Sequence, residues 1–131
     1  MSDYLEKKVQ DLVLGGVAFT APATHVALFT VAPSDTGGGT EVTGGAYGRV
    51  AVTNNTTNWP VATGVTAAKS NGTVITFATA TASWGTVVAF GIMDATTVGN
   101  LLWWGDLTTN KAVGNGDTPS FAVGALAFTM D

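Results

Sequence analysis

The chain has 131 residues, of which 46% are apolar and only 11% are charged, and its formal net charge is −4. Because globular chains typically carry about 25% charged residues, much of this surface must be uncharged and polar, and the 22 threonines supply that character. The five basic residues do not form a cluster, which argues against nucleic-acid binding. The absence of cysteine excludes disulfides and thiolate metal sites.

The start of the chain lacks the features of a secretion signal. Residues 2–4 contain no basic side chain, and no apolar run follows them. The uncharged stretch 70–93 is interrupted by glycine, asparagine and threonine, so it does not read as a membrane span. We therefore expect a protein that is made in the cytoplasm, does not enter a membrane, and forms one domain over residues 1–131.

Residues 1–15 have the pattern of a short helix. Asp3 is placed to cap it, and Glu6 three residues later completes a capping-box pattern. Four apolar residues share one helical face: Leu5, Val9, Leu12 and Val13. Two glycines at 15–16 end the helix. Two roles remain open for this segment, a helix packed on the rest of the fold or an arm that docks on a neighbouring subunit.

From residue 25 onward the pattern alternates with period two, which is typical of strands. Strands are predicted at 25–31, 49–53, 73–77, 86–93, 101–104 and 121–130, with 86–104 forming a hairpin. Turn-rich segments separate them, including a glycine-rich loop at 33–48. The last segment is apolar on both faces, so we expect it to be central or covered by another subunit. The pattern predicts a mainly β, single-domain β-sandwich or barrel-like fold with a short N-terminal α-helix.

The residues that usually carry chemistry are scarce. His25 is the only histidine and lies inside a predicted strand, where a core or rim position is expected. The seven Asp and two Glu residues are scattered. The glycines at 37–39 lack the Lys-Ser/Thr ending of a phosphate-binding loop. We therefore expect no catalytic residues, no metal site and no cofactor, and hence a protein that is not an enzyme.

Four tryptophans are the remaining distinctive feature. Trp103 and Trp104 are consecutive, so on a strand their side chains point to opposite faces. One of them can fill the core while the other faces outward. Two interpretations remain open: core packing for all four tryptophans, or an outward tryptophan at a subunit contact or a glycan-binding surface.

Eight motifs are distinctive in combination: VALFT (26–30), APSD (32–35), GGGTEV (37–42), GGAYGRV (44–50), ITF (75–77), ASWGTV (82–87), FGIMD (90–94) and GDTPSF (116–121). Together they resemble a family of small tailed-phage virion proteins. Members of this family often carry the name tail fibre protein, and some are thought to be capsid cement or decoration proteins. The resemblance covers nearly the whole chain and implies a structural virion protein.

The resemblance, together with the compact length, favours a capsid cement protein that stabilises the shell from outside. We expect it on the capsid surface, bound to the major capsid protein and to copies of itself as a dimer or trimer, without nucleic acid or membrane. The alternative is a tail fibre or tail-tip subunit that contacts host-surface glycans. The residues expected to dock partners are Leu5, Val9, Leu12, Val13, Tyr47, Arg49, Trp103 and Trp104.

Overall fold

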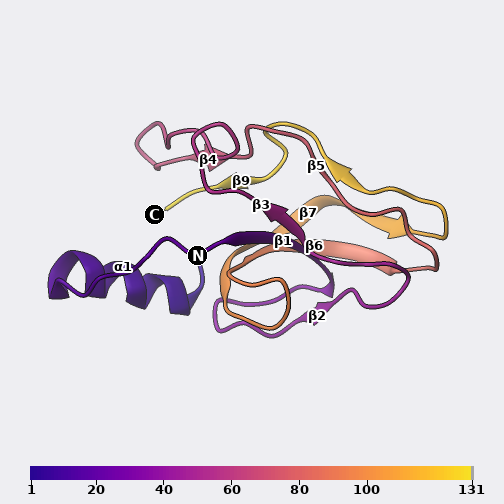
Figure 1. Ribbon diagram of the computed structural model, residues 1–131, viewed down its shortest axis with the longest axis horizontal. Coiled ribbons are helices and arrows are strands. Elements are labelled where there is room, and N and C mark those ends of the chain that lie inside the picture. The colour runs from indigo at the N-terminus through magenta and orange to yellow at the C-terminus, as the bar shows by residue number, and fades with distance from the viewer. Residues whose placement is uncertain (131) are drawn as a thin grey trace.

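A computed structural model describes residues 1–130, and these contain one helix and nine strands (Figure 1). In chain order the elements are α1 Asp3–Gly15, β1 Thr24–Val31, β2 Thr40–Glu41, β3 Val50–Val52, β4 Lys69–Ser70, β5 Ile75–Thr76, β6 Gly85–Met93, β7 Leu101–Val113, β8 Ser120–Phe121 and β9 Ala127–Phe128. The prediction of a mainly β fold with an N-terminal helix is confirmed.

Five antiparallel strands form the main sheet. β1 pairs with β6, from His25 opposite Met93 to Phe29 opposite Ala89, and β6 pairs in turn with β7. The other edge of β1 is shared by β3, which lies beside its start, and β2, which lies beside its end. The β6–β7 pair confirms the hairpin predicted over 86–104.

Two small sheets, β4–β9 and β5–β8, form a second layer over one face of the main sheet (Figure 1). The larger apolar cluster fills the space between the layers and includes Val26, Leu28, Trp59, Phe77, Trp84, Phe90, Leu102 and Leu126. Aromatic rings dominate this core, and Phe90 contacts both Phe121 and Phe128 edge-to-face. The sheets do not close into a barrel, so of the two predicted architectures the sandwich is the one that forms.

The opposite face of the main sheet carries a second, smaller apolar cluster. It consists of Ala27, Phe29, Ala89, Met93 and Leu101. Alternate residues of β1 enter the two clusters, which is why β1 is apolar on both faces. Residues 37–39 and 98–99 help to enclose a pocket of about 310 Å³ on this face. Gly39 is required there, because its φ is +76° and an added Cβ would lie 2.6 Å from the carbonyl oxygen of Val31.

Two predicted strands are shorter in the structure than predicted. The segment 121–130 is not one strand, because a turn closed by the Ala125 amide donating to the Ala122 carbonyl at 3.0 Å interrupts it. Gly124 adopts a φ of +77° in this turn, and β8 and β9 therefore join different small sheets. The predicted strand 73–77 is reduced to Ile75–Thr76.

β7 extends to Val113, far beyond the predicted end at residue 104. In its middle, residues 107–110 stand opposite the single residue Val88, because Asp106 pairs with Ala89 and Lys111 with Val87. A bulge of this kind disrupts the free edge of a strand and makes it a poor template for pairing with another chain. The polar residues of the bulge conceal the continuation of the strand from a reading based on hydrophobic alternation.

Candidate docking surface

The first turn of α1 is fixed to the start of β7. The Oγ of Ser2 accepts a hydrogen bond from the Leu5 amide at 3.3 Å and donates to the Leu101 carbonyl, and the Ser2 amide donates to the Leu102 carbonyl at 3.0 Å. Ser2 is therefore the N-cap, and the predicted capping role of Asp3 is wrong by one residue. The predicted end of the helix is confirmed by Gly16, which has a φ of +64°.

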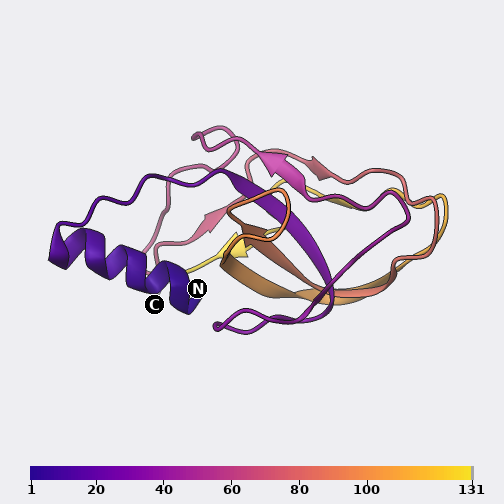
Figure 2. The same cartoon turned by 60° about the horizontal axis from the view of Figure 1, so that its bottom comes forward.

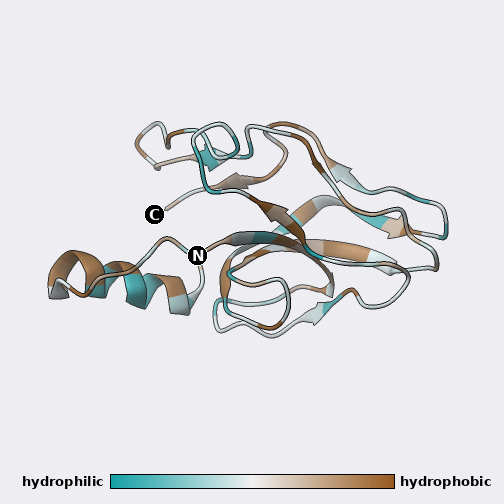
Figure 3. Ribbon diagram, in the orientation of Figure 1, coloured by the Kyte–Doolittle hydropathy of each residue, from teal (hydrophilic) through white to brown (hydrophobic). Residues whose placement is uncertain are grey.

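The second half of α1 extends away from the sheet and exposes apolar side chains (Figure 2). Leu5 is only 4% exposed and belongs to the core, and Val9 is half-buried against it. In contrast, Leu12, Val13 and Leu14 are 44%, 70% and 85% exposed. Colouring by hydropathy shows the apolar character of this projecting end (Figure 3). The helix is thus packed on the sheet at its start and presents an apolar surface at its end.

An apolar groove of about 590 Å³ has two walls. One wall is α1 together with the segment that leads from it to β1, and the other includes β9. The helix side contributes Leu5, Val9, Leu12 and Phe19, and the opposite side contributes Trp59, Trp103, Phe128 and Met130. Among residues 1–130, Lys69 is the only charged residue that lines it. A concave apolar surface of this size accepts an apolar ligand or side chains from another protein.

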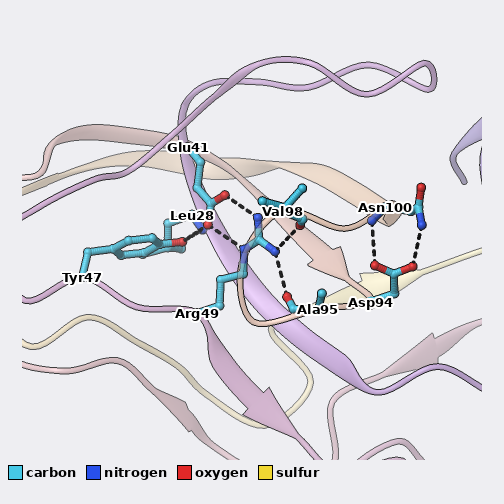
Figure 4. A network of polar contacts seen from close by, with 8 residues as sticks. All are labelled: Leu28, Glu41, Tyr47, Arg49, Asp94, Ala95, Val98 and Asn100. Carbon is cyan, nitrogen blue, oxygen red and sulfur yellow. Dashed lines mark hydrogen bonds and ion pairs between the residues drawn. The ribbon is translucent and has the colours of Figure 1, made fainter.

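Tyr47 and Arg49 belong to a polar network that holds loops together (Figure 4). Arg49 forms a bidentate ion pair with Glu41, Nε to Oε1 at 2.8 Å and Nη2 to Oε2 at 2.7 Å. Its Nη1 donates to the carbonyls of Ala95 and Val98, both at 2.7 Å. The hydroxyl of Tyr47 donates to Oε1 of Glu41 at 2.8 Å. The arginine side chain is only 6% exposed, so this cluster is internal.

The network shifts the pKa of each of its three members. Burial raises the pKa of Glu41, but hydrogen bonds from Arg49 and Tyr47 and the charge of Arg49 outweigh burial, so the pKa lies below its ordinary value. Burial raises the pKa of Tyr47 well above its ordinary value, although the hydrogen bond from the Leu28 amide opposes the rise. The hydrogen bond to Glu41 raises the pKa of Arg49. At neutral pH the pair is therefore charged and the phenol is neutral.

Trp103 and Trp104 point to opposite faces of the sheet, as predicted. Trp103 packs against the larger cluster, with its ring 5.9 Å from that of Phe128, and lines the apolar groove. Its Nε1 is buried and has no hydrogen-bond partner among residues 1–130. Trp104 packs against the smaller cluster, and its Nε1 donates to Oδ1 of Asp35 at 3.0 Å. Both rings are partly exposed, so each tryptophan serves the core and the surface together.

The eight residues predicted to dock partners fall into separate places. The apolar groove is lined by Leu5, Val9, Leu12 and Trp103, and Val13 lies beside it. Tyr47 and Arg49 belong to the internal network. Trp104 lies on the opposite face of the sheet. The structure thus unites residues from the two ends of the sequence in one surface. Their role in docking stays a prediction.

The family model described as Podophage GP4 fiber I protein gp80 matches residues 1–129. The chain belongs to this family of phage fibre proteins. The predicted resemblance to phage virion structural proteins is confirmed over nearly the full length. The family description names a fibre protein, so it supports the fibre interpretation more directly than the capsid cement interpretation. A comparison with curated proteins finds no match.

The part of the chain that the structure describes has neither a metal cluster nor a membrane-spanning helix. Within residues 1–130, no three or more His, Asp or Glu side chains gather closely enough to hold a metal ion. No helix in that range is both long and apolar enough to cross a bilayer. His25 is 7% exposed within β1, which confirms its predicted place in the core or at its rim.

Several groove residues carry no periodic signal in the sequence. Phe19 lies in the segment that returns from α1 to β1, where no pattern predicts an element. Met130 and Phe128 come from the closing segment, whose apolar character on both faces was the only available signal. Trp59 is buried in the core and also lines the groove, and no sequence pattern indicates the second role.

Proposed function

We propose that this chain is a structural subunit of the fibre apparatus of a short-tailed bacteriophage and that it acts by binding other virion proteins. The observation that carries the proposal is the match of residues 1–129 to a podophage fibre protein family. The surface supports it, because the chain combines few charges with an apolar groove. Repetition over many copies makes a weak contact per copy sufficient in a virion.

The compact fold suits a joint or cap within a fibre assembly better than a shaft. The shaft of a fibre is usually long because it consists of sequence repeats or of a heptad coiled coil. This sequence shows no fixed-period repeat, and α1, with 13 residues, is too short for a coiled-coil shaft. In our proposal the subunit connects longer components or attaches them to the tail.

The fibre proposal includes contact with host-surface glycans. Trp104 is the better placed of the two tryptophans, since its ring is partly exposed and its indole nitrogen holds Asp35 alongside it. A ring face beside a carboxylate offers stacking together with a hydrogen-bond acceptor for sugar hydroxyls. Loss of binding on a glycan array in Trp104→Ala, with binding retained in Trp103→Phe, is the expected result. Equal binding by the wild type and Trp104→Ala would exclude this contact.

Capsid cement is the second candidate. The same compactness favours it, because a small β protein with one apolar end suits a seam between capsid subunits. In this case the partner is the major capsid protein and the chain binds the outside of the shell as a dimer or trimer.

Separation of heads from tails distinguishes the two candidates. Purified particles are dissociated mildly, and the chain is quantified in each fraction by mass spectrometry against the major capsid protein. The fibre proposal predicts the chain in the tail fraction. Recovery with the shell would contradict it and support cement, and absence from both fractions would contradict both.

Particles that lack the chain provide a functional test. The fibre proposal predicts poor adsorption to host cells, with shells that withstand heating as well as complete particles do. The cement proposal predicts normal adsorption and fragile shells. Complementation with the wild-type chain controls for indirect effects on assembly.

A further inference from the structure

Exposed apolar side chains concentrate around the groove, at one end of the molecule. We call this the apolar end and define it as residues 12–19, 60–68 and 128–130. Of the eleven large apolar residues that are exposed among residues 1–130, four lie in 12–17, two in 61–65, and Met130 is the seventh. Leu14 and Val65 are the most exposed of these. Monomeric soluble proteins rarely expose large contiguous apolar patches, so this end is suited to a contact.

We propose that the apolar end binds a second copy of this chain, with the end of α1 from each copy seated in the groove of the other. The inference goes beyond the proposed function, because it concerns self-association and holds for a fibre subunit or a cement protein alike.

The shapes of the two surfaces favour a second copy as the occupant. The groove is concave and apolar, and the nearest convex apolar surface is the projecting end of α1 with Leu12, Val13 and Leu14. The two surfaces lie side by side. A two-fold axis between two copies therefore brings the C-terminal end of α1 of each copy to the groove of the other copy at the same time. One reciprocal contact then covers both exposed surfaces.

The charges at the apolar end are also complementary. Among residues 1–130, Lys69 is the only charged residue that lines the groove, and its Nζ donates to the Pro60 carbonyl at 2.8 Å. Asp11 is the last charged residue before the end of α1, and the next Asp, Glu, Lys or Arg residue is Asp35. Neither Asp11 nor Lys69 forms an ion pair within residues 1–130. In the reciprocal contact Asp11 of one copy approaches Lys69 of the other copy. An unrelated apolar partner need not supply an acidic residue opposite Lys69.

Sedimentation velocity over a wide concentration range tests the proposal. The purified wild-type chain is expected to form a dimer that dissociates on dilution. Leu14→Glu places a charge in the contact and is expected to raise the dissociation constant at least about tenfold. Val31→Glu is the matched control, since Val31 is exposed at the far end of β1 from Thr24, which lines the groove.

A charge exchange tests the identity of the occupant. Asp11→Lys and Lys69→Asp are each expected to weaken the dimer, because each places like charges opposite one another. The double variant restores the opposite charges and is expected to regain most of the affinity. Far-UV circular dichroism confirms that each variant is folded.

Two results would overturn the proposal. One is a wild-type chain that stays monomeric at the highest concentration. The other is a dimer that Leu14→Glu and Val65→Glu leave intact, which places the contact elsewhere. A double charge variant that is no better than the single variants would exclude the reciprocal approach of Asp11 and Lys69.

Discussion

At the residue scale, the ion pair between Arg49 and Glu41 shows how one buried side chain orders loops that are poor in apolar residues. The guanidinium joins β2 to the loop after β6 through the Ala95 and Val98 carbonyls. Tyr47 adds its hydroxyl to Glu41 and its ring to Trp84, edge-to-face at 5.3 Å. Contacts from within the chain therefore hold the glycine-rich loop 33–48 in place.

Glu41→Gln is expected to destabilise the fold by about 1–3 kcal/mol, because it leaves the buried guanidinium of Arg49 without its counter-charge. Thermal denaturation followed by circular dichroism measures the change. Glu6→Gln, at an exposed helix position, is the control and is expected to be nearly neutral. Equal melting temperatures for the two variants would show that the network contributes little.

The same pair predicts a pH dependence. The pKa of Glu41 is lower in the folded chain than its ordinary value of 4.5, so the unfolded chain binds the proton more readily. Its contribution is complete above that ordinary value and is lost as the pH falls through the folded pKa. The difference in melting temperature between wild type and Glu41→Gln is therefore expected to shrink as the pH is lowered below 4.5. A difference that grows on acidification would contradict this.

Asn71 is the second residue on which the fold depends. It is 1% exposed, its Nδ2 donates to the Thr73 and Ala122 carbonyls, both at 2.8 Å, and its Oδ1 accepts from the Leu126 amide at 2.9 Å. These bonds connect the two small sheets. In the sequence Asn71 stands before a glycine, as turn asparagines often do, and no local pattern distinguishes it from an exposed turn residue.

Asn71→Ala is expected to cost about 2–4 kcal/mol, since it leaves buried backbone groups without partners. Chemical denaturation measures the loss. Asn115→Ala, in an exposed loop, is the matched control and is expected to change stability by less than about 0.5 kcal/mol. Comparable losses for the two variants would refute the role assigned to Asn71.

At the element scale, α1 depends on Ser2 for both its cap and its attachment to β7. Ser2→Ala removes the bond to the Leu5 amide and the bond to the Leu101 carbonyl. We expect a loss of about 1–2 kcal/mol and faster hydrogen exchange throughout the first turn of the helix. Ser120→Ala, at an exposed position of β8, serves as control. Unchanged exchange in residues 3–6 would mean that the hydroxyl of Ser2 contributes little to holding α1.

The elements differ in how far the sequence predicts them, and the differences have physical causes. α1, β1 and β6 follow from strong periodicity, because each buries one face or both. β7 was predicted too short, since residues 107–110 form a bulge whose polar residues 108–110 interrupt the alternation. The segment 121–130 was predicted as one strand, because its apolar run conceals the turn at Gly124. In both segments, pairing with distant strands sets where the strands begin and end.

At the scale of the whole molecule, one end is apolar and the remaining surface is mainly threonine, asparagine and glycine. The sequence predicts part of the candidate site, since Leu5, Val9 and Leu12 share a helical face. It does not predict the groove, whose walls join α1 to Trp59 and to Phe128 near the other end of the chain. No local sequence pattern indicates that segments so far apart in the chain lie next to each other.

We propose that this member of a phage fibre family is a structural part of the fibre apparatus. Cryo-electron microscopy of the intact particle, with density fitted by residues 1–130, is the decisive measurement. We expect density for this fold at the tail, at the fibre attachment or along the fibre, with neighbouring copies in contact through their apolar ends. Density for this fold confined to the icosahedral shell, with a tail that lacks it, would contradict the claim.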